Sequence, residues 1–204
     1  MAEHIDAGKL DKPVQVLELR ETAAGVWEWA PVRRAWASIT MQARTNLFSQ
    51  VGIGARDAAI VLRRQTLTLH NAIRWGTRHL FLTAITERGR GHLDVEAALV
   101  RVATCRAVRT EDSVGTAGRP VPAETMRTVF PGVLTEKYAR YEREETHAEG
   151  DTSYVLVTPK AIQLDPGDLV TVQDGNAPGV YHVTIAHKLD DYKNEYEIAR
   201  RGDV

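Results

Sequence analysis

The sequence predicts a mainly β protein made of two small β-barrel or sandwich lobes with little helix. Short apolar runs in which every second residue is polar recur along the 204 residues, and this alternation is typical of strands with one buried face. Gly, Pro and Asp turns separate these runs. The pattern also occurs twice in the same order, which indicates a degenerate duplication.

The first lobe contains the clearest strand pattern. Leu93 and Val95 fall on one face of a strand at 92–99, while Asp94 and Glu96 fall on the other. The glycine-containing stretch 87–91 before this strand predicts a hairpin turn. Further strands are expected at 14–19, 27–39, 59–64 and 65–70.

The second lobe repeats parts of this order. A Pro-Gly turn leads into a strand within 164–172, and another strand is expected from Val180. Because identity between the halves is low, chance resemblance between two β patterns is the alternative to duplication. If the halves are duplicates, the second lobe lacks a counterpart to Val26–Arg56. The aligned starting points are Gly8 with Gly132, Asp57 with Asp151, and Arg78 with Val180.

A change in composition marks the expected boundary between the lobes. Residues 106–130 are rich in Gly, Pro, Thr and Ser and predict a linker. We therefore expect one domain at 1–105 and a second at 131–204. Weak helix candidates lie at 122–130, where Pro122 precedes an Ala-Glu-rich turn, and at 44–52.

Bulk properties favour an ordinary globular protein of the cytoplasm. The first ten residues lack the basic-then-apolar pattern of a secretory signal, and no apolar run approaches the roughly 20 residues that cross a bilayer. Cys105 is the only cysteine, so no internal disulfide or thiolate metal cluster can form. The net charge is about +5 up to Val108 and about −6 after it.

The sequence shows no convergent set of catalytic, cofactor-binding or metal-binding residues. The Gly52–Arg56 stretch lacks the third glycine of a dinucleotide fingerprint, and no serine lies in a GxSxG elbow. The histidines lack HxH and HExxH spacing, so surface or interface roles are expected for them. Of the seven histidines, the candidates considered for such a site are His70, His79, His92, His182 and His187. We therefore expect neither an enzyme nor a cofactor.

Arginines are the remaining feature of the first lobe. They suit protein–protein interfaces, where the guanidinium pairs with carboxylates. Basic faces of small barrels can also hold single-stranded nucleic acid, but the four tryptophans are expected to be half-buried rather than displayed for stacking. We favour a protein interface, and the expected interface residues are Arg33, Arg34, Arg63, Arg64, Arg88 and Arg90.

The first lobe resembles the head–tail connector proteins of tailed bacteriophages, in the head-closure or "stopper" β-barrel group. The resemblance rests on a Gly-x-Leu start, a Trp-Ala strand, an Arg-ended strand, and a Trp-Gly followed by an apolar strand. It covers about the first half of the chain. The matching stretches are Gly8–Leu10, VQVLEL at 14–19, WASI at Trp36–Ile39, AIVLRR at 59–64 and Ile73–Ala97.

This resemblance implies a structural protein of the virion neck, assembled in the bacterial cytoplasm. Such proteins form a ring, commonly a hexamer, with the portal or head–tail adaptor above and the tail terminator or tail tube below. The ring retains packaged double-stranded DNA. The loop 40–56 would face the channel, with expected DNA-facing residues Arg44, Asn46, Leu47, Phe48, Gln50 and Arg56.

The chain departs from the group in length, because the second lobe nearly doubles it. The second lobe could decorate the ring or bind the tail terminator. Another neck component, such as an adaptor or tail-completion protein, is therefore an alternative to the stopper. A barrel-type module that binds single-stranded nucleic acid is the alternative from a different class.

Overall fold

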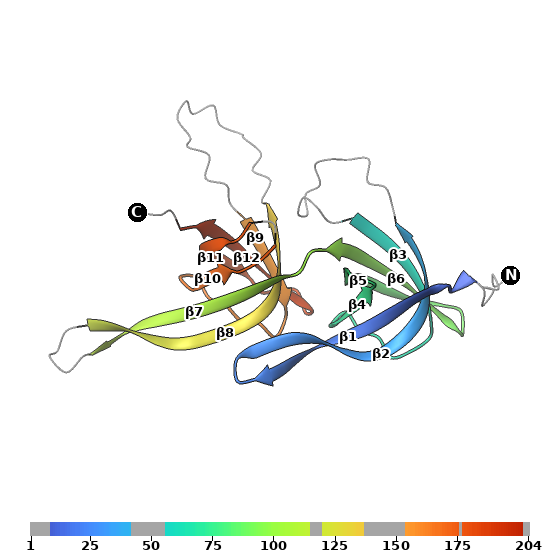
Figure 1. Ribbon diagram of the computed structural model, residues 1–204, viewed down its shortest axis with the longest axis horizontal. Helices are drawn as coiled ribbons and strands as arrows, with labels where there is room; N and C mark the ends of the chain where they lie inside the picture. Colours follow the sequence, from blue (N-terminus) through green and yellow to red (C-terminus); the bar gives the residue numbers. More distant parts are fainter. Residues whose placement is uncertain (1–8, 42–55, 115–119, 137–153, 176, 202–204) are drawn as a thin grey trace, which may run out of the picture. The chain divides into compact units, whose positions relative to one another are not determined.

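The computed structural model describes residues 9–41, 56–114, 120–136, 154–175 and 177–201. These ranges are mainly β, as the sequence predicts, and Figure 1 labels the strands. No helix within them is long and apolar enough to cross a membrane. The strands are β1 (Lys12–Ala23), β2 (Val26–Met41), β3 (Arg56–Arg63), β4 (Asn71–Trp75), β5 (Arg78–Arg88), β6 (His92–Val100), β7 (Ala103–Val114), β8 (Pro120–Glu136), β9 (Tyr154–Pro159), β10 (Leu169–Val172), β11 (Gly179–His187) and β12 (Lys193–Arg200).

The twelve strands hydrogen-bond as one sheet, and contacts divide the chain into two compact units. The strand order is β1-β4-β5-β6-β3-β2-β8-β7-β10-β11-β12-β9, with additional pairings β1–β2 and β8–β9. Unit 1 comprises Met1–Arg20, Trp29–Ser49 and Ile53–Arg101. Unit 2 comprises Glu21–Glu28, Gln50–Gly52 and Val102–Val204.

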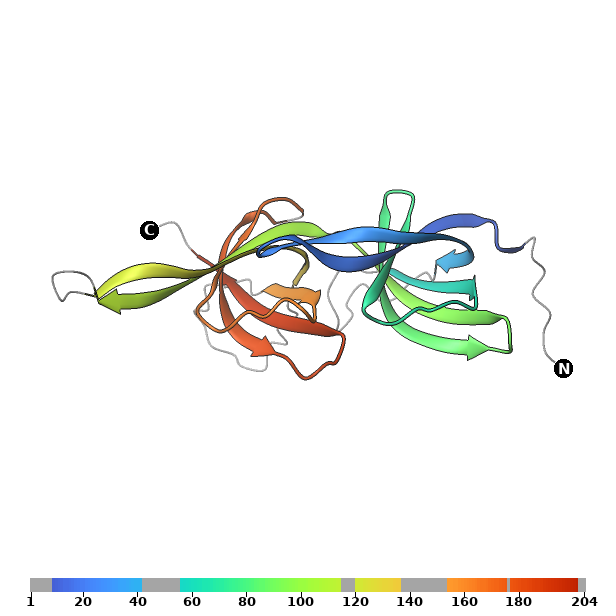
Figure 2. The same cartoon turned by 90° about the horizontal axis from the view of Figure 1, so that it is seen from below.

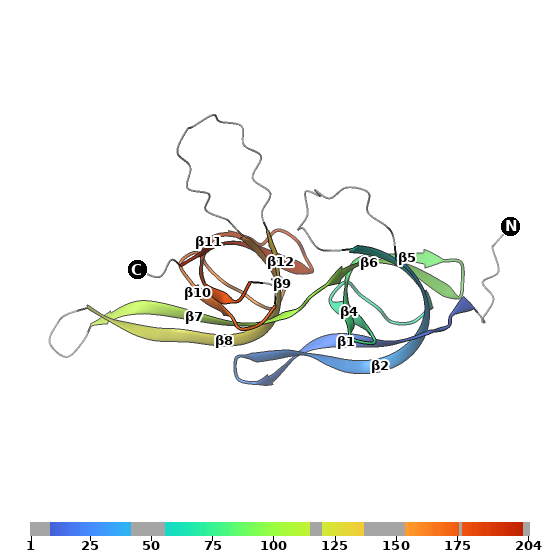
Figure 3. The same ribbon diagram turned by 45° about the horizontal axis from the view of Figure 1, so that its top comes forward.

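The strand pairings of unit 1 run in a continuous circuit. From β1 the order is β4, β5, β6, β3 and β2, and β2 pairs again with β1. Neighbours from β1 to β2 along this order are antiparallel. A register shift between Leu82 and Ala84 bends β5. Figure 3 shows these strands wrapping around a common interior.

Alternating apolar residues fill that interior. In β3, Ala58, Ile60 and Leu62 are buried, while the residues between them are only partly buried. They pack in one cluster with Ile73 of β4 and Val95 of β6, among others. Fully burying an aliphatic side chain stabilises a fold by about 1.5–3 kcal/mol. The period-two pattern of the sequence therefore identifies the core face of these strands correctly.

The strand pairings of unit 2 form a second circuit. From β7 the order is β10, β11, β12, β9 and β8, and β8 pairs with β7. Adding six to every strand number of unit 1 reproduces this order. Figure 2 shows β11 and β12, in red, side by side. Its core combines aliphatic residues such as Leu156 and Ile198 with three aromatic ones, Phe130, Tyr181 and Tyr196, which are at most 1% exposed.

Residues 106–130 do not form the linker that their composition predicted. Residues 106–114 continue β7 and residues 120–130 begin β8, and the two strands pair from Ala103↔Gly132 to Val114↔Pro120. The helix expected at 122–130 is wrong for the same reason, since these residues extend along β8. The two halves of this segment pair mainly with each other across a hairpin, and composition alone does not distinguish the polar strands of a hairpin from a linker. The helix candidate at 44–52 lies outside the described residues.

The predicted repeat alignment agrees with the strand order only in part. Asp57 and Asp151 both lie at or just before strands of equal rank, β3 and β9. Gly8, however, precedes β1, whereas Gly132 lies in β8, which has the rank of β2. In this order β8 has the rank of β2, a strand for which the sequence predicted no equivalent in the second lobe. The predicted second lobe starts at 131, after β7 and most of β8. Gly8, which precedes β1, is therefore aligned with a residue near the end of β8.

Candidate functional site

An exposed tryptophan and an arginine share the outer face of β2 in unit 1. Trp36 is 60% exposed, while its neighbour Ala37 is fully buried. Successive side chains of a strand point to opposite faces, so Trp36 points away from the core. Arg34, two residues earlier, is also exposed. The expectation that the tryptophans are half-buried holds for Trp27, Trp29 and Trp75 and is wrong for Trp36.

Two hollows flank this tryptophan, and we call them together the Trp36 face. The first has a volume of about 420 Å³ and the second about 450 Å³. Both are lined by Arg34, Ala35 and Trp36. The first is completed by Leu10, Arg63, Arg64 and Gln65, and the second by Pro13, Val14, Gln15, Arg74 and Gly76. The face therefore combines an apolar indole with four guanidinium groups.

The structure gathers most of the predicted interface arginines at one end of the unit 1 strands. Arg63 of β3 and Arg88 of β5 both lie opposite His92 of β6 in the strand register. The Arg64 amide donates to the Gly91 carbonyl in the β5–β6 turn at 2.8 Å, and Arg90 lies in that same turn. Antiparallel pairing thus brings together arginines that are up to 27 positions apart in the sequence.

Only some of these arginines are neutralised. Arg64 forms an ion pair with Glu87 at 2.7 Å, and Arg88 with Asp94 at 3.3 Å. Both pairs are solvent-exposed, so each is worth at most about 1 kcal/mol. Arg33 donates to the Thr66 carbonyl. Within the described part of the chain, Arg34 and Arg63 have no carboxylate partner, and the face keeps a positive charge.

The predicted channel loop begins at the opposite end of β3 from these arginines. Met41 pairs with Ala58, and Arg56 pairs with Leu99, whereas Arg63 lies at the other end of the eight-residue strand. A strand of this length spans about 25 Å. Of the predicted DNA-facing residues, Arg56 is the first residue of β3. Arg44, Asn46, Leu47, Phe48 and Gln50 lie outside the described residues.

His79 is a largely buried histidine beneath unit 1's surface. Its Nε2 atom is buried and has no hydrogen-bond partner among the described residues. The imidazole lies 5.5 Å from the Trp29 ring. Burial, with a smaller effect from the charge of Arg74, lowers the pKa of His79 to about 4. The side chain is therefore neutral at pH 7 and is part of the packing.

The other histidines for which surface or interface roles are expected lie in both units. His187 contacts Glu197 at 3.2 Å on the surface of unit 2. Through the described ranges, no group of three His, Cys, Asp or Glu side chains is close enough to hold a metal ion. Cys105 is buried in unit 2, and burial raises the pKa of its thiol to about 12. This thiol is protonated at neutral pH and is a poor nucleophile.

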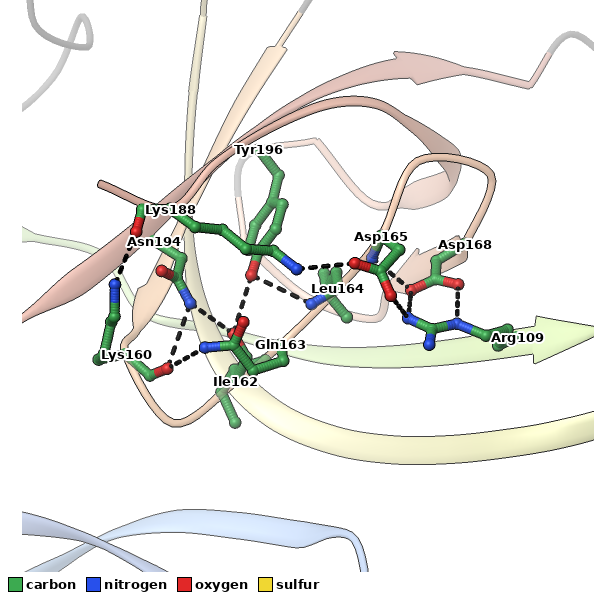
Figure 4. A network of polar contacts seen from close by, with 10 residues as sticks. All are labelled: Arg109, Lys160, Ile162, Gln163, Leu164, Asp165, Asp168, Lys188, Asn194 and Tyr196. Atoms are coloured by element: carbon green, nitrogen blue, oxygen red, sulfur yellow. Dashed lines mark hydrogen bonds and ion pairs between the residues drawn. The ribbon is translucent and has the colours of Figure 1, made fainter. Parts of the chain in front are cut away.

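A polar network holds the connection between β9 and β10 against unit 2 (Figure 4). The Tyr196 hydroxyl donates to the Ile162 carbonyl at 2.9 Å and accepts from the Leu164 amide at 3.1 Å. The Asn194 side-chain amide donates to the Ile162 carbonyl at 2.8 Å. Asn194 is fully buried, so these bonds serve the backbone of a buried connection. The network is structural.

An arginine clamp continues the same network. Arg109 of β7 bonds both carboxylate oxygens of Asp168 at 2.7 Å and also reaches Asp165 at 2.6 Å. Asp168 is only 2% exposed, and bonding to it raises the pKa of Arg109. Lys188 bonds Asp165 at 2.7 Å and lowers the pKa of that carboxyl group. The Pro-Gly turn expected from the sequence is therefore fixed to β7 and to the end of β11.

The turn between β11 and β12 carries the most exposed apolar side chain of the described residues. Leu189 is 100% exposed, and Tyr192 in the same turn is 39% exposed. Asp190 folds the turn, since its carboxylate accepts from the Tyr192 amide at 2.7 Å and the Lys193 amide at 3.1 Å. Asp191 is exposed between them. We call residues 188–193 the Leu189 turn.

Sequence reasoning identified the arginines but missed Trp36 and Leu189 as surface residues. The Trp36 position was recoverable from alternation, because Ala35, Ala37 and Ile39 mark the inward face of β2. Leu189 could not be found in this way, because it lies in a turn between β11 and β12, where alternation does not mark an inward face.

Comparison of the chain with known protein families, curated proteins and solved structures finds no match.

Proposed function

We propose that this chain is a structural protein of the neck of a tailed bacteriophage, a head-closure ring that retains packaged DNA. One observation carries the proposal. The stretches that resemble the connector group fall on successive strands of one circuit: 14–19 in β1, Trp36–Ile39 in β2, 59–64 mostly in β3 and Ile73–Ala97 in β4 to β6. The matching stretches thus fall on all six strands of the circuit in unit 1.

We also propose that each unit is a six-stranded β-barrel and that the two arose by duplication. The return pairings β1–β2 and β7–β8 close each circuit, which removes free sheet edges. The identical strand order favours duplication over chance resemblance. The segments 42–55 and 137–153 then connect strands of equal rank.

Charge separation supports assembly of copies into a ring. Unit 1 contains 14 Lys and Arg against 8 Asp and Glu, and unit 2 contains 12 against 19. The net charges are therefore +6 and −7. Unlike surfaces that meet head to tail generate a ring when the rotation closes. The neighbours would be the portal or adaptor on one side and the tail terminator or tail tube on the other.

The decisive experiment adds the purified protein to DNA-filled, tailless heads of its own phage. Binding to the heads with suppression of DNA leakage supports head closure. Light scattering of the protein alone gives its mass before docking. Binding without suppression of leakage would favour another neck component, such as an adaptor or tail-completion protein.

A variant lacking residues 45–54 tests the channel loop. The deletion lies between the end of β2 and the start of β3 and leaves residues 42–44 and 55 to join them, which is a common length for a hairpin loop. We expect a folded protein that docks on heads but releases DNA. Normal DNA retention by this variant would exclude a channel role for the loop.

Exposure of Trp36 beside arginines also favours a second candidate, a module that binds single-stranded nucleic acid. Aromatic stacking with phosphate contacts is the usual mode of such binding. This candidate predicts that the wild-type monomer binds short single strands and that binding weakens steeply with salt. It also predicts no attachment to heads.

A further inference from the structure

We propose that the Trp36 face of unit 1 binds the Leu189 turn of a second copy of this chain. This inference rests on the proposed ring and identifies the surfaces by which neighbouring copies would meet. Three properties of the two surfaces support it: apolar content, local charge and exposure.

The apolar match comes first. Trp36 is 60% exposed between two hollows of about 420 and 450 Å³, and Leu189 is fully exposed at the end of a hairpin. An exposed tryptophan is a common anchor of protein interfaces. Binding would bury the apolar surfaces of both Leu189 and Trp36 away from water, which stabilises the contact by the hydrophobic effect.

Local charges are complementary. Arg34 and Arg63 on the Trp36 face have no carboxylate partner within the described ranges. In the Leu189 turn, Lys188 is neutralised by Asp165 at 2.7 Å and Lys193 by Glu195 at 3.2 Å. Asp191 remains exposed and has no cation partner among the residues that the structure describes. The turn therefore presents a carboxylate to guanidinium groups.

The conformation of the turn is fixed before binding. Asp190 accepts two backbone hydrogen bonds inside the turn, and Lys160 donates to the Lys188 carbonyl at 2.8 Å. A preorganised loop loses little conformational entropy when it docks. Because the contact joins two different surfaces, each bound pair of copies leaves one face and one turn free for further copies.

Nucleic acid is the less suitable occupant of the Trp36 face. Single-strand binding usually uses several stacked aromatics along a basic groove. Trp36 is the one tryptophan of four that is exposed, and the chain carries an overall charge of −1.

The first test measures self-association of the full chain by sedimentation velocity over a range of concentrations. We expect wild-type mass to rise with concentration, and Trp36→Ser or Leu189→Ser to weaken the association by about tenfold or more. Val32→Ser and Val180→Ser are matched controls, since both valines are exposed at 37–40% and lie outside the proposed contact. Circular dichroism verifies that the variants fold.

A charge-swap pair tests direct contact. The variants Arg34→Glu/Arg63→Glu and Leu189→Lys/Asp191→Lys should each fail to self-associate, whereas their mixture should form heterodimers. In the mixture, the unchanged turn of the first variant fits the unchanged face of the second. Failure of the mixture, with both variants folded, would overturn the inference.

Engineered cysteines locate the contact. Trp36→Cys and Leu189→Cys chains, mixed and oxidised, should crosslink to each other faster than either does alone, and buried Cys105 should remain unreacted. Crosslinking in the mixture that is no faster than in either variant alone would contradict a contact between copies.

The outcomes separate this inference from the proposed function. A wild-type chain that stays monomeric at all concentrations, or that associates equally well without Trp36 and Leu189, overturns the inference but leaves head closure to the head-binding assay. Loss of short single-strand binding in Trp36→Ser, without any effect on mass, would assign the face to nucleic acid instead.

Discussion

His79 shows how one residue can make the stability of the fold depend on pH. Its Nε2 atom is buried without a hydrogen-bond partner in the described part of the chain, and its pKa is about 4 instead of the usual 6.5. As the pH falls below 6.5, the unfolded chain binds a proton at this position before the folded chain does. Stability from this group is therefore present above pH 6.5 and is lost as the pH falls towards 4.

We expect the free energy of unfolding to fall by up to about 3 kcal/mol between pH 7.5 and 4 through His79. Urea unfolding at several pH values measures this loss. In His79→Phe, the slope over this range should be smaller than in the wild type. The exposed His70→Gln variant should keep the wild-type slope. An unchanged slope in His79→Phe would show that the imidazole is accessible to protons in the folded state.

Gly132 is a second residue that matters to the fold, because its surroundings leave no space for a side chain. A Cβ atom there would lie 2.8 Å from Leu156 Cδ1 and 2.9 Å from Cys105 Sγ, and both neighbours are fully buried. We expect Gly132→Ala to lower the free energy of unfolding by about 1–3 kcal/mol through overpacking. Gly91→Ala is the control, because nothing lies within 4 Å of its Cβ position. Equal unfolding midpoints for the two variants would contradict this packing.

At the scale of elements, strand pairing and a few polar contacts order the connections. The β9–β10 connection has no regular structure of its own, yet Ile162 and Leu164 within it are at most 1% exposed. Arg109 fixes its far end through Asp165 and Asp168. Residues 106–130 illustrate the same dependence, because the β7–β8 pairing turns an apparent linker into strands.

Removal of the buried Asp168 carboxylate should therefore lower the free energy of unfolding substantially. We expect Asp168→Asn to destabilise the protein by about 2–4 kcal/mol, because Arg109 loses its buried partner. Glu124→Gln removes a comparable arginine partner on the surface, where Arg127 and Glu124 are 58% and 37% exposed, and should cost much less stability because solvent screens the pair. Denaturant unfolding compares the two variants. Similar losses would show that burial of Asp168 has no energetic consequence.

At the scale of the whole molecule, the dominant feature is the opposite charge of the two units, +6 and −7. Attraction between unlike units of different copies is screened by salt. We expect self-association to weaken between about 50 and 500 mM KCl, where the screening length falls from roughly 14 to 4 Å. Sucrose at matched osmolality is the control. Association that strengthens with salt would indicate a contact dominated by apolar burial.

The sequence by itself determined the mainly β class, the core faces and the arginine-rich character of the first half. Those properties are local, because alternation along a strand fixes which side chains face inward. In β3, Ala58, Ile60 and Leu62 were identifiable from spacing alone. The same alternation in β2 predicts that Trp36 points outward and is exposed.

The tertiary structure alone decided which strands pair and which residues meet. The composition of 106–130 does not reveal the β7–β8 hairpin, because composition records neither the pairing of β7 with β8 nor their further pairing with β10 and β9. The gathering of Arg34, Arg63 and Arg88, at the opposite end of β3 from Arg56, follows from register between strands that are separated in the sequence. Register depends on the summed burial and hydrogen bonding of both partners, so it is a property of the folded chain as a whole.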